Sequence, residues 1–226
     1  MSIVVIPLKM HSMMTKNYIY IIFDRHQKEA VIIDPAGDLD IIEDVFIQYG
    51  LSLSAILVTH THPDHVALIP SLVRKYGCRV WVSGKEQLTP FLSSYKKLAL
   101  ITTEAPFNAA QLAITPISTP GHTFGSICYL IGDNLFSGDT LFIEGCGMCF
   151  GSGSDPKLLF SSLNKLKKVI KPSTKIFPAH SYGHEPGKLF GFLLDNNFYL
   201  QFKEEQEEMF VAFRMRKRQA SLFDFQ

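Results

Sequence analysis

The chain has 226 residues and a mass of 25.5 kDa, the size of one large domain or of one domain with a small appendage. Hydrophobic residues make up 46% and charged residues 19%, a composition that excludes disordered, collagen-like and coiled-coil proteins. The formal net charge is +1, so no overall field favours nucleic acid or an anionic membrane.

The first third of the chain alternates predicted strands and helices. Residues 17–23 and 29–34 are rich in β-branched and aromatic side chains and predict two strands joined as a hairpin. Asp38 can cap an amphipathic helix that ends at Gly50, and the apolar residues 53–58 predict a buried strand. Three elements are predicted to follow: a helix over 66–76, a strand over 79–82 and a helical stretch over 85–97.

The second strand-rich part of the chain contains a hairpin. Residues 126–131 and 135–137 flank Gly132-Asp133-Asn134, a strong turn signal between two strands. Asp155 followed by proline predicts the start of a helix that ends at Pro172. A short strand over 175–177 is expected next.

From about residue 187 the pattern becomes helical, with no further strand expected. Four apolar side chains near the end lie close to one predicted helix face: Phe202, Met209, Phe210 and Phe213. The acidic residues Glu204, Glu205, Glu207 and Glu208 lead in this segment, and basic residues follow, namely Arg214, Arg216, Lys217 and Arg218. This order complements a helix dipole, and because the two charges balance we interpret the segment as a capping helix and not as a nucleic-acid-binding tail. The two strand-rich halves, 17–58 and 112–178, predict an α/β fold with two sheets flanked by helices.

The segment of greatest chemical interest is His60-Thr61-His62-Pro63-Asp64-His65, directly after a predicted buried strand. Residues two apart in an extended chain point the same way, so His60 and His62 can reach one ion. Pro63 disfavours helix at the preceding residue, so a turn can direct Asp64 and His65 toward a second ion nearby. Imidazole and carboxylate ligands suit zinc, iron or manganese. A helix cap explains Asp64 but not three clustered histidines.

Three more residues lie at the ends of predicted strands and complete the candidate site. His122 precedes the hairpin at 126–137 and Asp139 follows it, so both are expected at one rim. Asp139 suits a bridging position because a carboxylate has two oxygens and can contact two cations. His180, after its own short strand, is the last expected ligand.

Together these motifs resemble the metallo-β-lactamase superfamily. The resemblance covers roughly residues 15–185 and is carried by the histidine-rich segment, Gly121-His122-Thr123, Ser137-Gly138-Asp139-Thr140-Leu141 and the isolated His180. Gly145-Cys146-Gly147 is similar to the glyoxalase II branch, the hydroxyacylglutathione hydrolases. The resemblance implies an αββα sandwich over residues 1–185 and a short helical C-terminal segment over 186–226.

The same resemblance implies a pair of divalent metal ions, with zinc expected and iron or manganese acceptable. The first ion would be held by His60, His62 and His122 and the second by Asp64, His65 and His180, with Asp139 between them. The implied reaction is hydrolysis of a small acyl thioester by a hydroxide that bridges the metals, with Asp64 also acting in catalysis by orienting that hydroxide. A thiol leaving group has a pKa near 8.5, so its departure does not require a separate general acid.

The resemblance also concerns the substrate. Tyr182 matches a substrate-binding tyrosine of the family, and Phe150 is expected at the substrate as well. Glyoxalase II enzymes usually place a lysine and a tyrosine where this chain has Met148 and Phe150. The thiol carrier can therefore be glutathione or another thiol, and the sequence does not decide between them.

Two other functions remain open at this point. Pro178-Ala179-His180-Ser181-Tyr182 resembles the related persulfide dioxygenases, which would use one iron held by His60, His122 and Asp139. The second alternative is a non-catalytic binding or sensor protein on the same fold, which Met148 and Phe150 suggest.

The expected location is the cytoplasm. No apolar run approaches the roughly 18 residues of a membrane span, and the first residues do not resemble a signal peptide. The 4 cysteines are too few for a disulfide scaffold and suit a reducing compartment. We expect a small-molecule substrate and neither nucleic acid nor membrane as a partner, while the sequence does not predict the oligomeric state.

Overall fold

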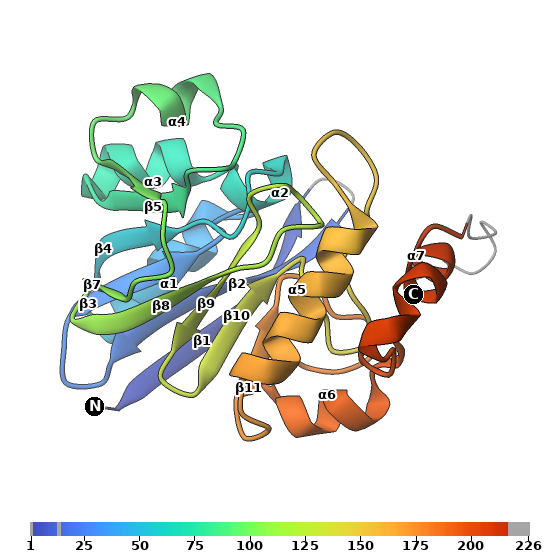
Figure 1. Ribbon diagram of the computed structural model, residues 1–226. Helices are drawn as coiled ribbons and strands as arrows, with labels where there is room; N and C mark the ends of the chain where they lie inside the picture. The colour runs from blue at the N-terminus through green and yellow to red at the C-terminus, as the bar shows by residue number, and fades with distance from the viewer. Residues whose placement is uncertain (1, 13–14, 217–226) are drawn as a thin grey trace.

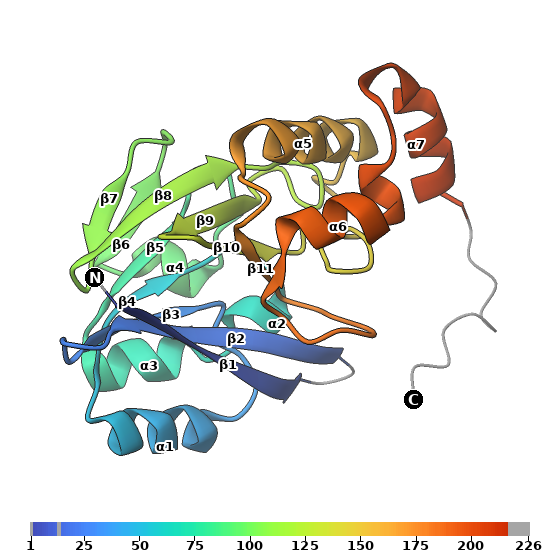
Figure 2. The same ribbon diagram turned by 90° about the horizontal axis from the view of Figure 1, so that it is seen from below.

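The strands lie in two mixed sheets that pack face to face, with helices on both outer sides (Figure 1; Figure 2). These are features of a computed structural model that describes residues 2–12 and 15–216. The predicted C-terminal bases Lys217 and Arg218 lie outside the described residues. The predicted α/β class with a sandwich of two sheets is confirmed.

The first sheet has the order β1-β2-β3-β4-β5-β6, and the second has the order β12-β11-β10-β9-β8-β7. The strands of the first sheet are β1 (Ile3–Ser12), β2 (Thr15–Asp24), β3 (Glu29–Ile33), β4 (Ser52–Leu57), β5 (Arg79–Ser83) and β6 (Leu98–Ile101). Those of the second are β7 (Phe107–Ala109), β8 (Leu112–Ser118), β9 (Ile127–Ile131), β10 (Asn134–Gly138), β11 (Lys175–Pro178) and β12 (Lys188–Leu189).

The helices follow the strands in two groups. On the first sheet are α1 (Leu39–Tyr49), α2 (Pro63–Val66), α3 (Ile69–Tyr76) and α4 (Pro90–Ser94). On the second are α5 (Pro156–Val169), α6 (Phe190–Asn196) and α7 (Glu207–Arg214), with two 3-10 turns, η1 (Phe198–Leu200) and η2 (Glu204–Gln206). None of the helices in the described ranges is long and apolar enough to cross a membrane.

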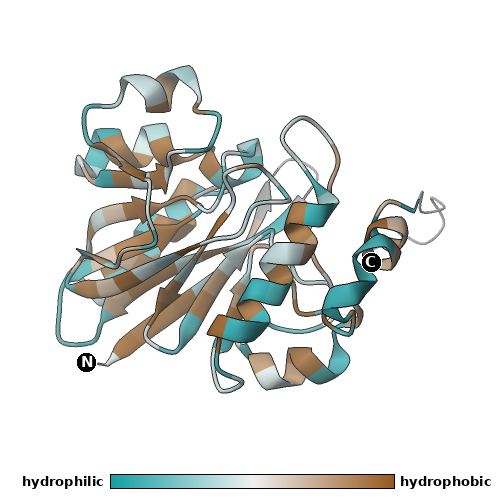
Figure 3. Ribbon diagram, in the orientation of Figure 1, coloured by the Kyte–Doolittle hydropathy of each residue, from teal (hydrophilic) through white to brown (hydrophobic). Residues whose placement is uncertain are grey.

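Side-chain alternation along β2 explains the layering. Tyr18, Tyr20 and Ile22 point into the core between the two sheets, and the intervening Ile19 and Ile21 point into the core under α1 and α3. A third core lies between the second sheet and α5, and it includes side chains of α6, η1 and α7. The central strands are accordingly apolar along most of their length (Figure 3). The division of the chain at residue 185 stays a prediction.

The predicted local signals for two helices are confirmed. The Asp38 carboxylate accepts a hydrogen bond from the Asp40 N–H at 2.9 Å at the start of α1, and Gly50 ends that helix with φ of 60°. Asp155 caps α5 by accepting from the Lys157 N–H at 2.8 Å. The predicted hairpins also form, since β2 pairs with β3 and β9 with β10, both antiparallel.

Several element predictions were wrong, and proline explains two of them. Strand β1 was not predicted; it contains Pro7, which an edge strand tolerates because the missing N–H can face outward. The predicted helix over 66–76 is divided, and α3 starts afresh at Ile69 with Pro70 in its first turn.

The remaining errors concern short elements. The predicted helical stretch 85–97 contains only α4, capped by the Thr89 hydroxyl, and is followed by β6. The short β12 was not expected after residue 187. On α7 the expected apolar face is incomplete, because Phe210 is fully buried while Met209 is 59% exposed.

A buried tyrosine joins the two sheets next to the candidate site. The Tyr129 hydroxyl, on β9, donates to the Val58 carbonyl at 2.8 Å, two residues before His60. We expect Tyr129→Phe to lower the free energy of unfolding by about 1–3 kcal/mol, because the buried carbonyl loses its hydroxyl partner. Urea unfolding at a fixed metal concentration measures this, with Tyr49→Phe at an exposed position as the control. An unchanged midpoint would contradict the prediction.

Candidate metal centre

The two sheets deliver their polar side chains to one edge. Four segments contribute, each directly or shortly after a strand: residues 60–65 after β4, His122 after β8, Asp139 after β10 and His180 after β11. Side chains at the ends of neighbouring strands share one edge of a sheet, and stacking the sheets brings both edges together. All seven predicted metal ligands therefore meet in one place.

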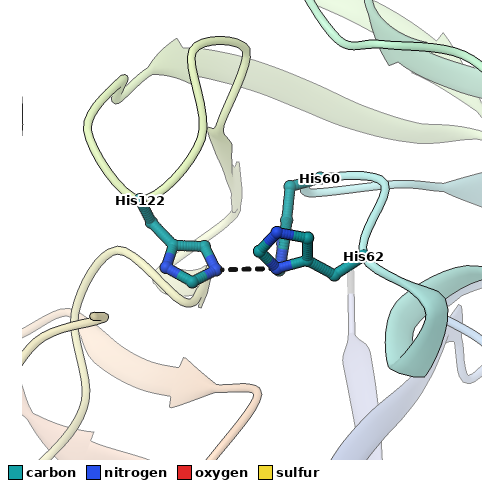
Figure 4. Close-up of side chains that lie close together, drawn as sticks. All are labelled: His60, His62 and His122. Carbon is teal, nitrogen blue, oxygen red and sulfur yellow. Dashed lines mark hydrogen bonds between the residues drawn. The ribbon is translucent and has the colours of Figure 1, made fainter. Parts of the chain in front are cut away.

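The first cluster consists of His60, His62 and His122. The Nδ1 atom of His62 lies 3.0 Å from Nε2 of His60 and 3.0 Å from Nε2 of His122. Figure 4 shows His122 reaching across from its own loop toward the other two rings. Three imidazole nitrogens facing one point form the ligand set that zinc and similar ions take.

The second cluster consists of Asp64, His65 and His180. The Oδ2 atom of Asp64 lies 3.9 Å from Nε2 of His65 and 3.7 Å from Nε2 of His180. The ligand atoms of the three residues all lie within 4.8 Å of one another. This arrangement is a second group able to hold a divalent ion.

Asp139 lies between the clusters. Its Oδ2 is 3.4 Å from Nε2 of His122, and its Oδ1 is 3.4 Å from Nε2 of His180 and 3.6 Å from Nε2 of His65. One oxygen therefore faces each cluster. This is the geometry expected of a carboxylate that bridges two sites.

Outer contacts fix the orientation of two of the rings. His122 donates from Nδ1 to the Met148 carbonyl at 2.7 Å, and His180 donates from Nδ1 to the Lys16 carbonyl at 3.0 Å. A carbonyl can only accept, so in both rings Nδ1 carries a proton, and Nε2 is the atom that faces the cluster. Such outer contacts are typical of metal-ligating histidines.

Asp34 has the same outer role for His65. Its Oδ2 lies 2.9 Å from Nδ1 of His65, and its two oxygens also accept from the N–H and hydroxyl of Thr59 at 2.7 Å and 2.5 Å. Asp34 forms a third group of potential ligands with His60 and His65, but the contacts to Thr59 and His65 occupy both of its oxygens. It is therefore better suited to orient His65 than to bind an ion.

Two buried atoms of the site fit a cation. Among the described residues, Nε2 of His65 and Oδ1 of Asp139 have no hydrogen-bond partner although both are buried. A buried polar atom without a partner costs about 1–3 kcal/mol. A divalent ion would satisfy both atoms, and with the donor set of imidazoles and carboxylates the residues fit such an ion.

Burial and neighbouring charges shift the pKa values of three residues of the site. Burial and the neighbouring histidines hold the pKa of His60 well below its usual value, so its ring is neutral. Burial acts to raise the pKa of Asp139, but the surrounding imidazoles outweigh it and lower that pKa. At His65 burial opposes the charge, but the carboxylates of Asp34 and Asp139 prevail and raise the pKa to about 9. The two carboxylates therefore favour a positive charge beside them, whether a proton on His65 or a metal ion.

The two predicted substrate residues lie at the surface. Tyr182 is 56% exposed, and its ring packs edge-on against Phe142, whose ring in turn lies against His180. Phe150 is 59% exposed and lies two residues after Met148, whose carbonyl holds His122. Both residues stay predictions as substrate contacts.

Several residues that support the ligands were not predicted from the sequence. Asn17, at the start of β2, is buried and donates from Nδ2 to the backbone carbonyl and Oδ2 of Asp64 at 2.7 Å and 3.1 Å. Arg214 of α7 is also buried and donates from Nε to the Gly147 carbonyl at 2.7 Å, next to the residue that holds His122. Both contacts join segments far apart in the chain, so the local pattern carries no signal for them.

Comparison with known proteins agrees with this geometry. The model of the metallo-beta-lactamase superfamily matches residues 15–180, so the chain belongs to that superfamily. It is 41% identical over 218 residues to a protein of Bacillus velezensis named "Probable polyketide biosynthesis zinc-dependent hydrolase BaeB", and the match covers 96% of each chain.

Two further proteins are similar to this chain over different shares of their length. The chain is 34% identical over 166 residues to a hydroxyacylglutathione hydrolase of Shewanella halifaxensis, covering 74% of this chain and 62% of that protein. The crystal structure of ETHE1 from Myxococcus xanthus superposes with a TM-score of 0.79 at 24% identity, covering 98% of this chain and 95% of that chain. The predicted resemblance to the superfamily and its hydroxyacylglutathione hydrolase branch is thereby confirmed.

Proposed function

We propose that the protein hydrolyses acyl thioesters with a pair of divalent metal ions, zinc being the expected metal. His60, His62 and His122 would hold one ion and Asp64, His65 and His180 the other. The observation that carries the proposal is the position of Asp139, which presents one oxygen to each cluster. A single-ion site would need only one of these contacts.

The ions, when bound, supply a water of lowered pKa and polarise the substrate carbonyl. The chain's own residues set the geometry for that chemistry. Asp64 is 24% exposed on its side chain and so borders both the second cluster and solvent, where it can accept a hydrogen bond from the attacking water. The leaving thiol has a pKa near 8.5 and departs as a thiolate without a protonating side chain.

The exposed residues Met148 and Phe150 and the similar proteins narrow the choice of thiol carrier. Met148 and Phe150 are 54% and 59% exposed, and they offer neither the positive charge nor the hydroxyl expected for glutathione. The relative that matches over nearly its whole length is named for polyketide biosynthesis, whereas the hydroxyacylglutathione hydrolase matches over 62% of its length. We therefore propose an acyl thioester of polyketide biosynthesis as the substrate, not a glutathione thioester.

Thiol release from two substrates tests this proposal. We expect the zinc-loaded protein to cleave an acyl-N-acetylcysteamine thioester, which mimics a pantetheine thioester, with a kcat/KM at least about 10-fold above that for S-lactoylglutathione. His62→Ala provides the background rate. The reverse preference would overturn the choice of carrier, and no cleavage of either thioester above background would overturn the proposed hydrolysis.

Metal content separates this function from the persulfide dioxygenase alternative. We expect protein purified without chelators to contain about two ions per chain and to consume no oxygen with glutathione persulfide. One iron per chain together with oxygen consumption would favour the dioxygenase.

A further inference from the structure

Glu86 lies in the turn after β5 and connects two loops of the metal centre. One carboxylate oxygen, Oε2, accepts from the N–H and the hydroxyl of Thr61 at 2.9 Å and 2.6 Å. The other, Oε1, accepts from the Gly125 N–H at 3.1 Å and from the Thr123 hydroxyl. The carboxylate therefore has two donors on each oxygen.

The partners of Glu86 are neighbours of the first-cluster histidines. Thr61 lies between His60 and His62 in the chain, and Thr123 directly follows His122. The second of these loops also approaches the backbone of Glu86, since a Cβ atom on Gly125 would lie 2.5 Å from the Glu86 nitrogen. A single side chain thus joins loops about sixty residues apart, and their histidine nitrogens meet at 3.0 Å.

We infer that Glu86 is a positioning residue that sets the spacing between His62 and His122. It acts from outside the cluster, because its carboxylate contacts the backbone and hydroxyls of the loops and not the imidazoles. The inference rests on the proposed metal centre but does not depend on the reaction that the centre performs. The turn after β5 would thus contribute to metal binding through Glu86, although the local sequence gives no sign of this.

The chemistry of the contact makes glutamine an informative replacement. Thr61 and Gly125 present backbone N–H groups, which can only donate, to opposite oxygens of Glu86. In Glu86→Gln one of these oxygens becomes an NH₂ group, which also only donates. Whichever way the amide turns, its NH₂ group faces one of the two N–H groups. The hydrogen bonds to one of the two loops are therefore lost, while the size of the side chain is retained.

Cobalt(II) titration of the intact protein, freed of metal, tests the inference without measuring turnover. We expect Glu86→Gln to bind cobalt about 10- to 100-fold more weakly than wild type, and to show a changed visible absorption band because the imidazole geometry changes. Glu104→Gln is the matched control, since Glu104 also accepts a backbone N–H, at 2.7 Å from Ser118, but outside the cluster. Wild-type affinity and spectrum in Glu86→Gln would overturn the inference.

A second pair of variants tests the inference independently, in case Glu86→Gln does not fold. Thr123→Val removes the hydroxyl that donates to Glu86, and Thr123→Ser keeps it. We expect weakened cobalt binding in the valine variant and near wild-type binding in the serine variant. Equal binding by both would overturn the inference, whereas failure of thioester hydrolysis with these cobalt results intact would overturn only the proposed function.

Discussion

Replacing Asp139 with asparagine is expected to lower thioester hydrolysis by about 1000-fold, the largest effect of any single substitution that we consider. The reason is that the Asp139 carboxylate faces both clusters, with Oδ2 toward His122 and Oδ1 toward His65 and His180. Asparagine keeps the shape but removes the negative charge and turns one of the two oxygens into a donor. A donor facing a cation is repelled, so one of the two ions should be lost.

Metal analysis after dialysis tests the expected loss of one ion. We expect about two ions per chain in the wild type and one or none in Asp139→Asn. Asp133→Asn is the control, since Asp133 is an exposed carboxylate in the turn between β9 and β10. If Asp139→Asn kept both ions and hydrolysed within about 10-fold of wild type, the bridging role would be wrong.

The parts of the fold that could be predicted from sequence are those with local signals. Strand β2 alternates between two buried faces, and α1 begins at a capping Asp38 and ends at Gly50. Such signals depend on residues within a few positions of one another. By contrast, β1 has a proline in its interior, and its pairing with β2 at the sheet edge decides its conformation.

In the candidate site, too, the residues that could be predicted are those with a local signal in the sequence. The spacing of His60, His62, Asp64 and His65 is enough to predict four ligands in one place, because all four lie in one short segment of the chain. His122 followed from its position before the predicted hairpin at 126–137, and Asp139 and His180 from their positions after predicted strands.

Residues that support the ligands could not be found by spacing. Glu86 fell within a predicted helix, yet it lies in a turn and reaches Thr61 and Thr123 in two other loops. Asn17 and Arg214 likewise act through contacts with distant segments. Side chains of these types are usually solvated, so only the packing of the whole chain reveals their function.

Gly147→Ala is expected to have the second-largest effect on activity, although the change adds only one methyl group. A Cβ atom at Gly147 would lie 1.8 Å from the Asp139 carbonyl oxygen and 3.1 Å from Nδ1 of His122. Neither the Asp139 backbone nor the ring of His122 can move away without moving a proposed metal ligand. Glycine is therefore required here for the close approach of two backbones.

The displacement would reach the ligands by two routes. It pushes on Asp139 directly, and it moves the next residue, Met148, whose carbonyl holds His122 at 2.7 Å. Arg214 resists the movement because its Nε donates to the Gly147 carbonyl at 2.7 Å. We expect hydrolysis to fall by about 100-fold, as misplacement of a reacting group by about 1 Å typically causes.

Gly145→Ala is the matched control for this prediction. The same methyl group at Gly145 would meet only the ring of Tyr199, at 3.6 Å, which is an ordinary contact distance. We expect this variant to keep wild-type hydrolysis and metal content, whereas Gly147→Ala should lose activity and part of its metal while staying folded by circular dichroism. Equal activity of the two variants would show that the loop can relax, and that the close contact between Gly147 and Asp139 does not position the metal ligands.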